Sequence, residues 1–318
     1  MTRLLLRRAV LSVGVFAMLA VITYLAVAAL PGDACTALLG KNATANKLVR
    51  CRAEHGLDAP VLQRLVDWMA GLFRGDLGYS VKRAVPVADL VVPRIRNALL
   101  LAGVASLLAF PAAIVVGVVL GSRRPRWAGR LVDRASLVAM TLPEFVTASV
   151  LWLVLSVWLP ILPAVTLVSS DDSLLDLLPN VWLPAITLAL LVFAHVMRSM
   201  RASVASTVHR PFAEAARLRG VPEKAVLRRH VLPAALPPAV NVIAVTGAWL
   251  LTGTFVVEVV FNYPGLGRLA VDAIADRDTD LILALTLLGL AVFIVASFVA
   301  DTTIRLLDPR VRAGSEQR

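Results

Sequence analysis

The chain has 318 residues, of which 58% are hydrophobic and 17% charged, with a mean hydropathy of +0.80 and a formal net charge of +11. Soluble domains carry about 45–50% apolar and about 25% charged residues, so this composition excludes a large soluble core, and the helix-length apolar runs exclude a barrel of roughly ten-residue strands. The basic excess lies beside apolar segments, as in cytoplasmic loops of membrane proteins, and does not indicate nucleic-acid binding.

Six apolar segments are long enough to cross a membrane, which takes about 20 helical residues. The first has the arginines and small residues of a cleaved signal peptide, but its apolar run exceeds the 7–15 residues of a signal core, which favours a retained helix. We therefore predict an all-α membrane protein with six transmembrane helices. They are residues 9–30, 97–121, 131–159, 181–197, 236–257 and 281–300.

The distribution of Lys and Arg predicts the orientation of these helices. Basic residues gather in the N-terminal segment, in the loops after the second and fourth helices, and at the C-terminus, whereas the loop after the third helix has three aspartates and no Lys or Arg. Since basic loops stay inside, both termini are expected in the cytoplasm. We predict three parts: residues 1–30 with the first helix, an extracytoplasmic loop domain at 31–96, and a core at 97–318.

The expected outer loop contains local structure. Apolar residues at helical spacing predict a helix over 60–74, and the Gly-Asp-Leu-Gly sequence at 75–78 predicts a turn. Cys35 and Cys51 are the two cysteines of the chain and would lie on the oxidising side, where disulfides persist. We expect a disulfide between them, with two free thiols as the alternative.

The cytoplasmic loop at 198–235 has the pattern of two short helices joined by a tight bend. Glu214 lies near the start of a run of helix-forming residues, where the helix dipole favours an acid. Gly220 permits the left-handed conformation that ends a helix, and Pro222 suits the start of the next one. Such a hairpin below the membrane is suited to contact a cytoplasmic partner.

Three motifs carry a resemblance to a known family. Glu214-Ala215-Ala216, followed by Gly220, resembles the EAA loop of binding-protein-dependent ABC importer permeases. Residues 57–60 and 75–80 resemble the outer loop of the dipeptide/oligopeptide/nickel branch, and residues 252–268 resemble its fifth-helix signature. The resemblance runs from Arg7 to Pro309, and the stretch from Cys35 to Cys51 departs from the family pattern, which leaves its structure open.

The resemblance implies a type I importer permease fold and a role as half of a peptide pore in the bacterial inner, or plasma, membrane. It implies a second homologous permease subunit as a heterodimer partner, two ATPase subunits, an extracytoplasmic binding protein and surrounding lipid. A nickel chelate or another small solute remains open as the substrate. By the resemblance, Glu214, Ala215, Ala216 and Gly220 couple the chain to the ATPases.

The chain itself is expected to be non-catalytic and to hold no cofactor. It contains no G-x-x-x-x-G-K-[ST] phosphate-binding loop, so ATP and magnesium would belong to the partner ATPases. No metal site is expected, because the four histidines are scattered and two cysteines cannot form a four-cysteine site.

Polar residues within the apolar segments are candidates for the translocation pathway or its gate. Glu144, after Pro143, either faces the pathway or is neutralised against a neighbouring helix. Asn241 either bonds across helices or lines the pore, and Glu258 either shapes the gate or lies at a solvated helix end. His195 is interpreted as an interfacial packing residue. An ion-coupled secondary transporter is the rival class, but it typically has inverted repeats, and none is evident here.

Overall fold

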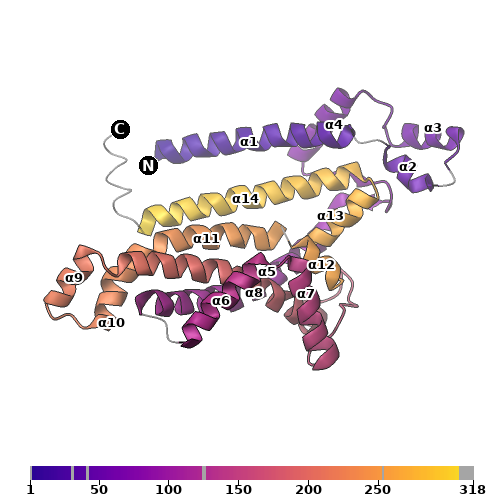
Figure 1. The fold of residues 1–318 in the computed structure, drawn as a ribbon. Helices are drawn as coiled ribbons and strands as arrows, with labels where there is room; N and C mark the ends of the chain where they lie inside the picture. The colour runs from indigo at the N-terminus through magenta and orange to yellow at the C-terminus, as the bar shows by residue number, and fades with distance from the viewer. Residues whose placement is uncertain (1, 30–31, 41–42, 124–126, 253, 308–318) are drawn as a thin grey trace. The chain divides into compact units, whose positions relative to one another are not determined.

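A computed structural model describes residues 2–29, 32–40, 43–123, 127–252 and 254–307 (Figure 1). Apart from one two-stranded hairpin, its regular elements in these residues are helices. They are α1 (Thr2–Ala28), α2 (Ala34–Leu39), α3 (Ala45–Glu54), α4 (Val61–Phe73), β1 (Tyr79–Ser80), β2 (Val85–Pro86), α5 (Val87–Ser122), α6 (Trp127–Thr141), α7 (Glu144–Trp152), η2 (Leu153–Trp158), α8 (Leu174–Thr207), α9 (Pro211–Leu218), α10 (Glu223–Val226), η3 (Leu227–Val231), α11 (Leu232–Thr252), α12 (Phe255–Val260), α13 (Leu266–Ala275) and α14 (Thr279–Leu307), with π-helical turns at η2 and η3.

Five stretches in the described residues are long and apolar enough to cross a membrane. They lie in α1, α5, α8, Glu223–Val260 and α14, and a sixth results if α6 and the helix that follows it form one bent span. This agrees with the predicted all-α fold. The real helices α5 and α8 extend beyond the predicted residues 97–121 and 181–197, because hydropathy detects only the apolar part of a helix.

Two predicted spans are not single helices. The segment 131–159 bends by 114° between Thr141 and Glu144. Pro143 has extended backbone angles (φ −57°, ψ 143°) and no N–H to donate, so the helix stops and restarts there. The segment 236–257 is also divided, since α11 ends at Thr252 and α12 begins at Phe255.

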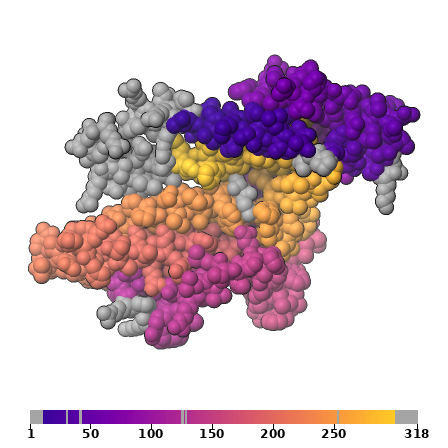
Figure 2. Space-filling view, turned by 45° about the horizontal axis from the view of Figure 1, so that its top comes forward, coloured from indigo at the N-terminus to yellow at the C-terminus, as the bar shows by residue number. Residues whose placement is uncertain are grey.

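The described residues separate into two compact units. The first covers 1–98, 169–171 and 264–294. In it, Leu65 and Trp68 of α4 pack against Ala20 and Tyr24 of α1, where the Tyr24 and Trp68 rings lie 6.1 Å apart. Figure 2 shows α1 in indigo beside the violet residues that follow it. The helix predicted over 60–74 is thus α4, and Leu65 and Trp68 on its apolar face are covered, whereas Leu62 remains exposed.

A polar network holds the β1–β2 hairpin within this first unit. The Ser80 hydroxyl donates to the carboxylate of Asp278, and the Tyr79 N–H donates to Asp280 at 3.1 Å. In the hairpin turn, Arg83 and Lys82 both form ion pairs with Asp276, at 3.3 and 3.2 Å. These contacts join residues about 200 positions apart in the sequence.

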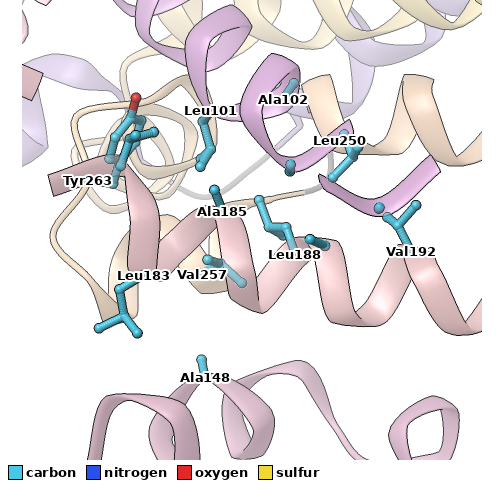
Figure 3. Packing of buried hydrophobic residues seen from close by; sticks show 14 of the residues in the cluster. Leu101, Ala102, Ala148, Leu183, Ala185, Leu188, Val192, Leu250, Val257 and Tyr263 are labelled. Carbon is cyan, nitrogen blue, oxygen red and sulfur yellow. The ribbon is translucent and has the colours of Figure 1, made fainter. Parts of the chain in front are cut away.

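Among the described residues, the second unit covers 99–168, 172–263 and 295–307 and is built around α8, which packs against α6, α7 and α11. Figure 3 shows Ala185 and Leu188 of α8 among side chains of neighbouring helices, including Leu101 and Leu250. α5 approaches α8 closely through a glycine: a Cβ added at Gly117 would lie 2.7 Å from a backbone oxygen of α8. This unit carries both the α9–α10 segment and the bend between α6 and α7.

Candidate functional site

The predicted cytoplasmic hairpin is present in the second unit. α9 begins with Pro211 at its first turn and ends before Gly220, which has φ +81°. The Gly220 N–H donates to the carbonyl of Arg217 at 2.9 Å, and the Val221 N–H donates to that of Ala216 at 3.2 Å. These bonds close the helix end in a left-handed turn, as the sequence predicted for Gly220.

The hairpin has a buried inner face and an exposed outer face. Ala213 and Ala216 of α9 are fully buried in a cluster with Val226 and Val231. The cluster continues along one side of α8 and the start of α11, so the hairpin is fixed to the helices that carry it. Glu214, Ala215 and Gly220 are exposed, and so is Leu218, at 90%. Of the four predicted coupling residues, Ala216 alone therefore has a packing role.

An ion pair braces the bend. The Arg217 Nε and Nη2 atoms donate to the two carboxylate oxygens of Glu223, at 3.0 and 2.9 Å, and Nη1 donates to the Val208 carbonyl at 2.9 Å. The hydrogen bond to Glu223 raises the pKa of Arg217 above its usual value. Sequence reasoning missed this pair, although opposite charges six residues apart across a predicted tight turn were the available signal.

A cavity of about 1040 Å³ lies in the same unit. Its walls come from the α6–α7 bend, α8, α11 and α12, and they are largely apolar. Glu144 is half-buried in the wall, at the first turn of α7. The lining residues are Ala139, Met140, Thr141, Leu142, Pro143, Glu144, Phe145, Leu191, Val192, His195, Val245, Thr246, Trp249, Phe255 and Val256.

His195 also lines this cavity, which its interpretation as an interfacial packing residue did not foresee. Its Nδ1 atom lies 2.9 Å from the Leu191 carbonyl oxygen one turn earlier. Leu191 and Val192 line the cavity as well, and residues three and four apart share one face of a helix. The helical spacing therefore predicts that His195 shares a face of α8 with Leu191 and Val192, but it does not predict that a cavity lies at that face.

The other two pathway candidates lie outside the cavity lining. Asn241 is exposed on α11. Glu258 is only 1% exposed and accepts a hydrogen bond from the Thr254 hydroxyl at 2.6 Å. The alternative of a solvated helix end at Glu258 is therefore wrong in this structure, because the side chain is buried and hydrogen-bonded.

In the first unit, Cys35 and Cys51 are joined by a disulfide that links α2 to α3. Beside it, Arg52 donates to Asp33 at 2.6 Å, and Asp33 caps α2 by accepting from the Thr36 N–H. Partial burial alone would raise the pKa of Asp33, but the hydrogen bonds from Thr36 and Arg52 outweigh it and lower that pKa. The bridge therefore belongs to a locally ordered segment.

Comparison with known proteins gives matches along almost the whole chain. The family described as binding-protein-dependent transport system inner membrane component matches residues 113–313, and a family described as its N-terminal membrane component matches residues 1–102. A Brucella abortus protein provisionally named a peptide transport system permease is 32% identical over 312 residues, covering 98% of this chain and 99% of its own. The oligopeptide transport system permease protein of Bacillus subtilis is 28% identical over 315 residues, with the same coverage of both chains.

Proposed function

Because this chain belongs to the family of binding-protein-dependent transport system inner membrane components, we propose that it forms half of a pore through which peptides enter the cell. Membership of the family confirms the predicted ABC importer permease, a multi-pass protein of the bacterial plasma membrane. The peptide substrate is inferred from the names of the two relatives described above, which refer to peptide and oligopeptide transport.

The observation that carries the mechanism is the two-faced hairpin of α9 and α10. Its inner face is fixed to α8 and α11 by buried alanines and valines, and its bend is braced by Arg217 and Glu223. A displacement of the exposed face would therefore be transmitted to two long helices of the second unit. We propose that this face docks onto a separate ATPase subunit, with Leu218 as its apolar anchor and Glu214, Ala215 and Gly220 around it.

The cavity at the α6–α7 bend is the proposed segment of the translocation pathway in this chain. It contains Glu144 and is walled by α8 and α11, the helices that carry the hairpin. Movement of the hairpin would thus change the cavity walls. The second half of the pore would come from a homologous permease subunit in a heterodimer, and ATP and magnesium would be bound by two partner ATPases.

The extracytoplasmic loop domain at 31–96 is proposed to receive the substrate-binding protein. Its order in the first unit rests on the disulfide, on α4 packed against α1, and on the ion pairs of the β1–β2 turn. A rigid outer segment suits the docking of a soluble protein, because little conformational entropy is lost on binding.

Reconstitution tests this function. The chain would be purified with its partner permease, ATPases and binding protein, placed in lipid vesicles, and assayed with a radiolabelled oligopeptide. We expect uptake that requires both ATP and the binding protein. Uptake that proceeds without nucleotide and follows an ion gradient would instead favour a secondary transporter.

A further inference from the structure

The polar groups of the cavity at the α6–α7 bend are mainly hydrogen-bond acceptors. The Thr141 hydroxyl donates its proton to the Val138 carbonyl at 2.9 Å, and the Thr246 hydroxyl donates to the Val242 carbonyl at 2.7 Å. Both threonines line the cavity, and their hydroxyl protons are already engaged. Each therefore offers lone pairs, and not a donor, to an occupant.

His195 extends this pattern. Its Nδ1 atom lies 2.9 Å from the Leu191 carbonyl, which can only accept, so the ring proton is assigned to Nδ1. The neutral ring then has an acceptor at Nε2. The indole N–H of Trp249 is the one side-chain N–H donor that the lining adds, since no Lys, Arg, Asn or Gln occurs among its described residues.

Glu144 supplies the negative charge. It is the one acidic residue in the described lining, it is half-buried, and no hydrogen bond or ion pair to it occurs among the described residues. Arg198 and Arg201, the basic residues that follow His195 on α8, both form ion pairs with Asp133 of α6. A carboxylate partly withdrawn from water without a cation is unfavourable, so an occupant with a positive charge would be stabilised here.

We infer that this cavity receives the ammonium group of the transported peptide, with Glu144 as its ionic partner and Thr141, Thr246 and His195 as further acceptors. An ammonium has three N–H donors and no acceptor, which matches an acceptor-rich wall. The inference rests on the proposed function and adds the end of the peptide that this chain recognises. The carboxylate end finds no cation in this lining and would be bound elsewhere in the pathway.

The test compares leucyl-leucine with N-acetyl-leucyl-leucine, which lacks the ammonium group, in ATP-driven uptake by the complete reconstituted transporter. Since a binding protein could itself discriminate between the two peptides, the measured quantity is the uptake rate of the free peptide divided by that of the acetylated peptide, compared between Glu144→Gln and the wild type. We expect this ratio to be about tenfold lower in Glu144→Gln than in the wild type, the size of a lost charge-assisted hydrogen bond. Glu54→Gln makes the same chemical change at an exposed position and should leave the ratio unaltered.

An unchanged ratio in an assembled Glu144→Gln transporter would overturn the inference. An equal loss of both peptides would do so too, because it would indicate a structural role. If that variant does not assemble, equilibrium binding of the two peptides to the wild-type transporter without its binding protein decides: about tenfold tighter binding of the free amine is expected, and equal binding refutes the assignment. A wild-type transporter that takes up neither peptide with ATP would count against the proposed function itself, and the inference would fall with it.

Discussion

Replacement of Gly220 by proline is expected to uncouple ATP hydrolysis from uptake while the protein still folds. Gly220 has φ +81°, and proline is restricted to φ near −65°, so the bend between α9 and α10 cannot keep its geometry. The preceding residue, Arg219, has ψ 7°, which is also disfavoured before proline.

The magnitude follows from the local contacts. Proline removes the Gly220 N–H that donates to Arg217 at 2.9 Å, a loss of about 1 kcal/mol, and the backbone strain of a proline in this left-handed turn costs about 1–2 kcal/mol more. The exposed Arg217–Glu223 pair adds at most about 1 kcal/mol. A total of about 2–4 kcal/mol is small beside a typical folding free energy of about 5–15 kcal/mol, so the change acts on the hairpin and not on the whole fold.

The structure offers a closely matched control in the first unit. Gly75 also has φ +81°, its N–H donates to the Leu72 carbonyl at 3.1 Å, the preceding Arg74 has ψ 0°, and a Cβ added there meets nothing within 4 Å, as at Gly220. Gly75→Pro therefore imposes the same backbone strain away from the hairpin. Uptake and substrate-stimulated ATPase activity would be measured for both variants in lipid vesicles.

We expect uptake to fall more than tenfold in Gly220→Pro, with ATP hydrolysis no longer stimulated by substrate, and to stay within about twofold of the wild type in Gly75→Pro. Wild-type uptake in Gly220→Pro, or equal losses in both variants, would refute the coupling role of the bend.

Three further predictions follow from the packing and the polar contacts. Gly117→Ala places a Cβ 2.7 Å from an α8 backbone oxygen and should lower the free energy of unfolding by about 1–3 kcal/mol, whereas Gly103→Ala, in open space on the same helix, should not lower it. Equal thermal unfolding midpoints for the two variants would contradict the close α5–α8 packing. Removal of the Cys35–Cys51 bridge, which spans 16 positions, should lower the free energy of unfolding by about 3 kcal/mol in a thermal unfolding assay. Peptide mapping without reductant that finds both thiols free would show that the bridge does not form. Burial raises the pKa of Asp278 despite its hydrogen bond from Ser80, so its contribution to stability is greatest at low pH and is lost as pH rises through the folded-state pKa. Asp278→Asn should therefore flatten the pH dependence of the thermal unfolding midpoint, and an unaltered pH profile would argue against a raised pKa at Asp278.

The sequence was informative where the structural signal is local. The apolar lengths predicted the spanning segments, the helical spacing predicted α4, and Gly220 predicted a left-handed helix end, because each depends on neighbouring residues alone. Pro143 made a kink at the α6–α7 junction foreseeable, but its 114° size depends on packing against α8 and α12, which hydropathy does not contain.

The candidate site was less predictable because its parts meet only in three dimensions. Glu144 was identified because an ionisable side chain in an apolar segment is energetically costly. His195 was interpreted as a packing residue because nothing in the sequence places its face of α8 opposite the α6–α7 bend. Glu258 could not be recognised as buried, since that depends on the separate helix α12. Long-range pairs such as Ser80 with Asp278 lie beyond any local pattern.

The exposed face of the α9–α10 hairpin is the proposed contact with an ATP-hydrolysing partner. A photo-crosslinking amino acid at position 218, where Leu218 is 90% exposed, tests this directly in membranes that contain the complete transporter, with position 54 in exposed α3 as the control. We predict a crosslink from position 218 to an ATPase subunit, none from position 54, and a yield that changes with bound ATP. Labelling from position 218 that reaches lipid or solvent alone, in a transporter that is active in uptake, would contradict the account.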